Sequence, residues 1–148
     1  MSAVQLFQAD PSLLGLPVGI FRYASRDFAK NCLPPRLWKL VERMCEGIDR
    51  PRITYQFQKL EPGQQFGHGK FHCDGRQTPD ERHRLLTVGG EPTLGIDGAV
   101  LSQKTVWEYP GDYEHKAQPV KKATWRLMLR VSDSTIRHRN YWSPPQWL

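Results

Sequence analysis

The sequence predicts a mainly β protein with N-terminal helices, folded as a double-stranded β-helix, or jelly-roll, barrel. Short segments with β-branched, aromatic and alternating apolar residues fill residues 51–133. The turn signals Gly89-Gly90 and Asp97-Gly98 separate some of these segments. The 12 prolines and 12 glycines fit a chain with many turns. A jelly roll suits these features because it pairs short strands that are distant in sequence.

The length of 148 residues is enough for one domain with a core of its own. We expect a single domain in three parts. Residues 1–50 form a helical N-terminal cap, residues 51–133 form the jelly-roll core, and residues 134–148 form a basic and aromatic tail. No internal repeat or low-complexity segment divides the sequence further.

Two helices are predicted in the N-terminal part. A short helix covers residues 25–31, with Ser25 as its N-cap. A clearer helix begins at Pro34-Pro35, since proline suits a first turn, and ends near Gly47. Its apolar residues recur at helical spacing: Leu37, Leu40, Val41, Met44 and Ile48. This stripe predicts packing against the core.

Strands are predicted from residue 17 onward. The expected segments are 17–23, 53–60, 66–73, 83–88, 93–96, 99–102, 105–109 and 125–132. His83 would begin its strand as a surface histidine. The polar residues 75–82 predict a loop at the mouth of a site. Arg76 in this loop could meet a substrate, or it could be an ordinary exposed loop charge.

The strand at residues 125–132 alternates cleanly between two kinds of side chain. One face carries Trp125, Leu127, Leu129 and Val131, and the other carries Arg126, Met128, Arg130 and Ser132. The predicted helix could cover the apolar face, so that the face with the arginines points into the barrel. Two arginines that line a polar cavity suit the binding of an anion.

Two histidines and one aspartate form a pattern typical of a metal site. On an extended strand His72 and Asp74 point to the same side, so both could bind one ion while Cys73 points away. His115 follows the turn at Pro110-Gly111 and lies at a strand edge. Two imidazoles and one carboxylate are the ligands of the facial triad of non-haem iron(II) oxygenases. The set leaves metal positions open for a co-substrate and oxygen.

The order His72-x-Asp74, His115 and then Arg126 eleven positions later resembles the motif of the 2-oxoglutarate/Fe(II)-dependent dioxygenases. The resemblance covers roughly residues 52–132, because the segment that starts at Tyr55 also looks like the family's strand and Pro-Gly turn before the metal motif. It implies that His72, Asp74 and His115 bind Fe(II) and form the catalytic centre.

The resemblance also implies how the co-substrate 2-oxoglutarate is held. Arg126 would bind its C5 carboxylate, while the metal takes its C1 carboxylate and keto oxygen. Arg130, Ser132 and Tyr55 are further candidates for contact with the cofactor. The implied reaction hydroxylates or oxidatively demethylates an unidentified substrate and releases succinate and CO2. A nucleobase, a protein side chain and a small metabolite all stay open as substrates.

Other interpretations of the same residues stay open. His72 and Asp74 could be a hydrogen-bonded polar strand edge, and Arg126 and Arg130 could be surface arginines of an edge strand. A cupin-like metal site is another possibility, although that pattern would have a second histidine in place of Asp74. The chain could also be a nucleic-acid-binding module or a structural or assembly protein that uses the barrel without turnover.

Charge and composition restrict the partners and the compartment. The net charge of +6 and the aromatic, basic tail permit binding to nucleic acid, but 15 acidic residues are interspersed with the basic ones. The tail could equally pack on the domain or on another subunit of a homo-oligomer. No stretch is long and apolar enough for a membrane span, and the start of the chain lacks signal-peptide regions. Three cysteines without a CxxC motif indicate the cytoplasm.

Overall fold

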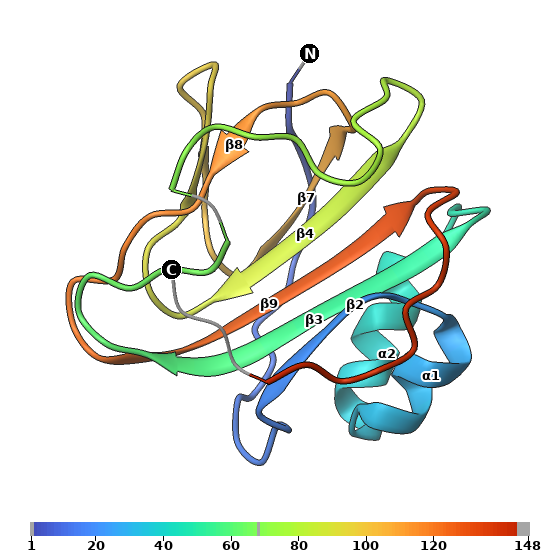
Figure 1. Ribbon diagram of the computed structural model, residues 1–148, viewed down its shortest axis with the longest axis horizontal. Coiled ribbons are helices and arrows are strands. Elements are labelled where there is room, and N and C mark those ends of the chain that lie inside the picture. Colours follow the sequence, from blue (N-terminus) through green and yellow to red (C-terminus); the bar gives the residue numbers. More distant parts are fainter. Residues whose placement is uncertain (1, 68, 145–148) are drawn as a thin grey trace.

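The computed structural model describes residues 2–67 and 69–144, and their regular secondary structure is mainly antiparallel strand. The last four residues of the predicted tail lie outside the described residues. In chain order the elements are β1 (Val4–Gln8), β2 (Gly19–Ala24), α1 (Arg26–Cys32), α2 (Pro35–Met44), β3 (Pro51–Leu60), β4 (Arg82–Val88), β5 (Thr93–Gly95), β6 (Val100–Leu101), β7 (Thr105–Pro110), β8 (His115–Lys116) and β9 (Thr124–Asp133) (Figure 1).

Two sheets form the body of the protein. The larger sheet has six strands in the order β1-β7-β4-β9-β3-β2, and the smaller sheet has three strands in the order β6-β5-β8. An antiparallel bridge between His72 and His115 adds one further segment next to β8. Strand pairing does not join the two sheets within the described residues, so the expectation of a closed barrel was wrong.

The alternation of β9 decides which face of the large sheet is the apolar core. Leu127, Leu129 and Val131 pack in one cluster with the buried side of α2. Trp125 belongs to the same face of the strand but stays 45% exposed, because it lies at the sheet's end. Figure 1 shows both helices on one side of the large sheet and β8 on the other. The expected covering of this face by the helix is confirmed.

Both helices begin where the sequence places their start. The Ser25 side chain accepts a hydrogen bond from the backbone N–H of Phe28 at 3.2 Å and so caps α1. Pro35 is the first residue of α2, and the chain leaves this helix through Gly47, whose φ of +76° favours glycine. Neither helix of the described residues is long and apolar enough to cross a membrane.

The N-terminal region does more than cap the core. Besides the two helices, it supplies β1, which pairs with β7, and β2, which pairs with β3. The C-terminal tail then runs along β2: the backbone N–H of Arg139 donates to the Tyr23 carbonyl, and Ser143 forms a bridge with Ile20. The described N-terminal and C-terminal regions therefore belong to the large sheet or lie beside it.

The prediction of a strand at residues 66–73 is wrong. The described residues of this segment form bends and a loop, and only His72 makes a strand-like bridge. Gly67 adopts a φ of +65°, a backbone conformation that interrupts a regular strand. The loop leaves the large sheet after β3 and passes over the space between the two sheets.

Candidate metal centre

A cavity of about 550 Å³ lies between the large and the small sheet. Its size is within the usual range of small-molecule sites. The polar faces of β3, β4 and β9 line it from the large sheet, for example through Gln56, Thr87 and Arg130. His115 and Thr93 line it from the small sheet, and the loop before β4 contributes His72 and Asp74. The cavity thus collects side chains from segments far apart in sequence.

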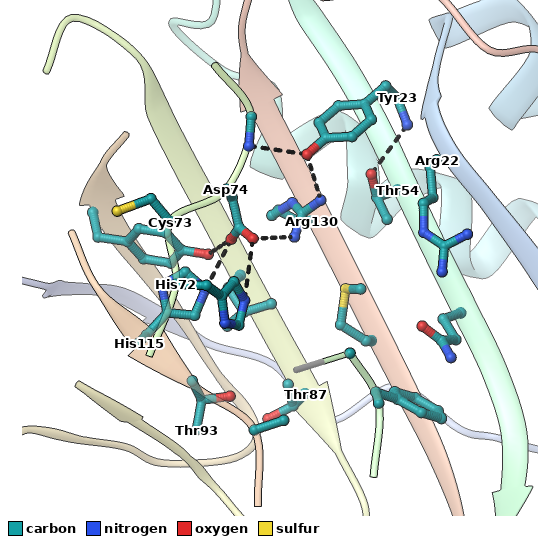
Figure 2. Close-up of a pocket in the computed structure, with 18 of the residues that line it drawn as sticks. Arg22, Tyr23, Thr54, His72, Cys73, Asp74, Thr87, Thr93, His115 and Arg130 are labelled. Atoms are coloured by element: carbon teal, nitrogen blue, oxygen red, sulfur yellow. Dashed lines mark hydrogen bonds and ion pairs between the residues drawn. The ribbon is translucent and has the colours of Figure 1, made fainter. Parts of the chain in front are cut away.

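His72, Asp74 and His115 come together at one end of this cavity (Figure 2). Each offers one ligand atom, and these three atoms lie within 4.8 Å of one another. The backbone groups of His72 and His115 exchange two hydrogen bonds of 3.0 Å, which set the two imidazoles side by side. Metal bonds of about 2.1 Å connect ligand atoms up to about 4.2 Å apart. A small side-chain adjustment would therefore let this cluster hold a metal ion.

Backbone carbonyls set the orientation of both imidazoles. Nδ1 of His72 lies 2.9 Å from the Lys70 oxygen, and Nδ1 of His115 lies 3.1 Å from the Tyr113 oxygen. A carbonyl only accepts hydrogen bonds, so each Nδ1 carries the proton. The other nitrogen, Nε2, is then the ligand atom in the neutral ring, and both Nε2 atoms are turned toward Asp74. Metal-binding histidines commonly have this second contact.

The contact between His115 and Asp74 calls for a cation. Nε2 of His115 lies 3.0 Å from Oδ2 of Asp74, and both atoms only accept when the imidazole is neutral and the carboxyl is ionised. Two lone pairs at this distance repel unless a positive charge lies between them. A divalent metal ion would supply this charge for all three side chains at once.

Asp74 is held ionised in spite of its burial. Burial opposes ionisation, but Arg130 and the hydrogen bond from His115 outweigh it and hold the pKa of the Asp74 carboxyl well below its usual value. Nη1 of Arg130 lies 3.2 Å from Oδ1, and the Tyr109 hydroxyl donates to Oδ2 at 2.7 Å. The carboxylate is therefore charged, oriented and ready to bind a cation over the whole physiological pH range.

Arg126 lines the same cavity as the triad, and its side chain is buried. Its Nη1 donates to the carbonyl oxygens of Gly89 and Glu91, which fix the guanidinium in place. Burial lowers the pKa of Arg126 to about 10, so the group stays charged at neutral pH. The hydroxyl-bearing residues Thr87 and Thr93 line the cavity too, below the triad in Figure 2.

Two of the expected cofactor contacts lie elsewhere. Tyr55 points to the opposite face of β3, where its ring stacks on Phe21 and its hydroxyl donates to the Pro17 oxygen at 2.5 Å. Ser132 is fully buried behind the cavity, with its Oγ 2.7 Å from Nδ1 of His83. Neither residue lines the cavity. The alternation of β3 explains Tyr55, because Thr54 and Gln56 take the cavity side of that strand.

Sequence reasoning missed several residues around the triad. His83 is 0% exposed, so its assignment to the surface was wrong. Its position in β4, two residues before Leu85 and four before Thr87, places it on the cavity side and was the available signal. Tyr109, Arg22 and Tyr23 also line the cavity. Tyr23 has a φ of +51°, and its hydroxyl accepts hydrogen bonds from Gly75 and Arg130.

Comparisons with known proteins give no family for this chain. No protein-family model matches it, and neither the curated proteins nor the solved structures contain a match.

Proposed function

We propose that this protein is an Fe(II)- and 2-oxoglutarate-dependent oxygenase that hydroxylates or oxidatively demethylates its substrate. One observation carries the proposal: the His72–Asp74–His115 cluster, with both Nε2 atoms turned toward the carboxylate, opens into a cavity that also contains the buried cation Arg126. Two imidazoles and a carboxylate are the ligand set of non-haem iron(II) oxygenases, and they leave room for a chelating co-substrate.

The path of the chain supports a double-stranded β-helix for this protein. From β3 onward, the chain crosses repeatedly between the sheets: β3, β4, β7 and β9 belong to the large sheet, and the His72 segment, the hairpin β5–β6 and β8 lie on the side of the small sheet. Four segments on each side of one cavity match the strand number of an eight-stranded jelly roll, in which the His72 segment would be reduced to one bridge. This fold would hold both ligand histidines at the same end of the cavity.

Arg126 suits the far carboxylate of 2-oxoglutarate. A guanidinium binds a carboxylate through two parallel N–H groups, and its five donors allow this while Nη1 keeps its contacts with Gly89 and Glu91. Thr87 and Thr93 supply hydroxyls to the same cavity. The cofactor would lie between Arg126 and the triad, with its keto acid end toward Asp74.

Other residues of the chain prepare the centre for binding. Arg130 and Tyr109 fix both oxygens of Asp74, and the Lys70 and Tyr113 carbonyls fix the tautomers of the histidines. Bound iron would supply the activation of oxygen, with 2-oxoglutarate as the source of two electrons. The protein's part is to orient the ligands, bind the anion and place the substrate over the open positions.

An anaerobic titration tests the proposal. Fe(II) and then 2-oxoglutarate are added to the apo protein, and the visible spectrum is followed for the charge-transfer band of the chelate. We expect a band that requires both components and is lost in His115→Ala. Arg126→Gln should keep Fe(II) binding but raise the concentration of 2-oxoglutarate that is needed for half the band by at least tenfold.

The exchange Lys39→Gln is the matched control for Arg126→Gln, because it removes a positive charge from the exposed face of α2. It should leave the band unchanged. An unaltered 2-oxoglutarate requirement in Arg126→Gln would refute the role of that arginine. A wild-type protein without a band and without bound iron would refute the oxygenase.

A further inference from the structure

A second cavity of about 580 Å³ adjoins the metal cavity on the side of the C-terminal tail. Gly75 and Arg139 line both cavities, so the two spaces meet at these residues. The remaining lining residues of the second cavity are Arg76 and the tail residues 136–138. We call the second cavity, together with Arg22 and Arg139 at the mouth of the first, the arginine groove.

The arginine groove is positively charged throughout. It contains the side chains of Arg22, Arg76, Arg137 and Arg139, and His138 lies among them. Asp74 is the one carboxylate among the described residues that line the two cavities, and Arg130 is paired with it. A guanidinium binds phosphate through parallel N–H groups, and a row of guanidinium groups suits an anion far better than a neutral ligand.

Several contacts fix the groove in position relative to the metal centre. The Arg139 backbone donates to the Tyr23 carbonyl at 3.1 Å, and the Asn140 side chain accepts from the Ser25 backbone at 2.8 Å. The guanidinium of Arg139 lies over the Tyr23 ring, 5.6 Å from its centre. The hydroxyl of that same tyrosine contacts Gly75 and Arg130 beside Asp74. Tyr23 therefore links the tail to the triad.

The groove concentrates like charges at one place. Burial, followed by the nearby charges of Arg130 and Arg139, lowers the pKa of Arg22. An arrangement of cations around a cavity is unfavourable by itself and becomes favourable when an anion enters it. The groove also contains more guanidinium groups than the binding of a single carboxylate requires, since Arg76 and Arg137 line the second cavity beyond Arg22 and Arg139.

We propose that the arginine groove binds phosphate groups of the substrate and thereby presents the attached group to the metal centre. This inference rests on the proposed function and adds the chemical class of its substrate. The phosphate belongs either to a small phosphorylated molecule or to a phosphodiester chain. A small molecule would occupy only the junction at Arg22 and Arg139, whereas a chain would also use Arg76 and Arg137.

Binding rather than turnover tests the proposal. The full chain is titrated, without iron or 2-oxoglutarate, with a fluorescent single-stranded decanucleotide, and unlabelled adenosine monophosphate and inorganic pyrophosphate are added as competitors. The test variant is Arg137→Gln with Arg139→Gln, and the control is Lys30→Gln with Lys39→Gln, which removes two exposed charges from the helices. We expect the test variant to bind at least tenfold more weakly and the control less than twofold.

The salt dependence and the competitors decide between the two sources of phosphate. For a phosphodiester chain, the magnitude of the slope of log affinity against log salt should fall by about 1.4 in the test variant, since two cations are removed and each contributes about 0.7 on a single strand. Binding of the small competitors as tightly as the decanucleotide would instead indicate a small phosphorylated substrate. Equal weakening in test and control variants, or no binding of any phosphate probe, would overturn the proposal.

The charge-transfer band keeps this test separate from that of the oxygenase. The test variant should retain the band with Fe(II) and 2-oxoglutarate, because Arg137 and Arg139 are not part of the triad. Loss of phosphate binding with the band intact shows that the groove acts separately from the metal centre. Phosphate binding in a wild-type protein without a band would refute the oxygenase and leave the groove as a phosphate site.

Discussion

His83 is a buried histidine beside the candidate metal centre, and its protonation affects the stability of the fold. Its ring is 0% exposed and contacts Tyr109, and its Nδ1 lies 2.7 Å from Oγ of Ser132. No hydrogen-bond partner for its Nε2 is found among the described residues. Burial and then the charge of Arg130 lower the pKa of His83 to about 4. The folded protein therefore holds this imidazole neutral.

Stability should consequently fall as the pH falls from about 6.5 to about 4. In this window the unfolded chain takes up a proton on His83 and the folded chain does not, so acid favours unfolding. The loss should be on the order of 3 kcal/mol across the window, at about 1.4 kcal/mol for each pKa unit. Urea unfolding at half-unit pH steps measures it. His83→Gln should flatten the curve above pH ~5. His138→Gln should change it much less, because His138 lies in the exposed tail, where partial burial and Arg52 lower its pKa without holding it in the core.

Gly75 follows Asp74 directly and has a positive φ, so its role in holding the loop can be tested by substitution. Its φ is +63°, and an added Cβ would lie 2.8 Å from Oε1 of Glu81. Gly98 has a similar φ of +86° but nothing within 4 Å of such a Cβ. Gly98→Ala should cost about 1 kcal/mol of unfolding free energy from backbone strain alone. Gly75→Ala should cost at least about 1 kcal/mol more.

Chemical denaturation of both variants separates strain from packing. Glu81 already accepts a hydrogen bond from the backbone of Arg76 at 2.8 Å, so it cannot retreat from the new methyl group without losing that bond. Fe(II) affinity should fall in Gly75→Ala and not in Gly98→Ala, because only the former lies next to a ligand residue. Equal losses in the two variants would mean that the loop is free to move away.

At the scale of single elements, the cap of α1 carries a measurable part of the stability. The helix has only seven residues, too few to be stable alone. The Ser25 hydroxyl satisfies the backbone N–H of Phe28, and the Ser25 backbone holds the tail through Asn140. Ser25→Ala should cost about 1 kcal/mol in urea unfolding. Ser25→Thr keeps the acceptor and should cost much less; an equal loss in both variants would count against the cap.

The elements that the sequence predicts well are those whose side chains alternate or repeat without interruption. β9 and β3 have ten residues each, and their core faces can be read directly from Leu127, Leu129 and Tyr55. β1 was missed because it lies at the edge of the sheet and is largely exposed, so no apolar alternation marks it. β8 has only two residues and leaves no pattern to detect.

At the candidate site too, the sequence predicts contacts between residues close together in the chain and does not predict contacts between residues far apart. The pairing of His72 with Asp74 follows from a spacing of two residues, and the bridge to His115 restores strand geometry where the segment itself is a loop. The contacts of Asp74 with Arg130 and Tyr109 depend on how the elements pack. Residues so far apart in sequence carry no mutual signal in a single chain. Sequence reasoning therefore found the three residues of the candidate metal site and missed most of the residues that orient them.

At the scale of the whole molecule, a bound metal ion should link the loop before β4 to the small sheet and so stabilise the folded state. His72 and Asp74 lie on that loop and His115 lies in β8, and the two segments are joined by two backbone hydrogen bonds and the contact between the Asp74 and His115 side chains. An ion bound to all three side chains would bind the folded state alone. At a concentration of 100 times its Kd it should add about 2.7 kcal/mol to the free energy of unfolding.

Thermal unfolding with Mn(II), a redox-stable substitute for Fe(II), should therefore show a rise in Tm of roughly 5 to 10 °C. Hydrogen exchange should slow at residues 72–75 and in β8, while β1, which lies at the far edge of the large sheet, should exchange as before. His115→Ala should abolish both effects, because two ligands on one loop cannot join it to the other sheet. The same rise in Tm in His115→Ala would place the ion elsewhere and would remove the triad as the metal centre.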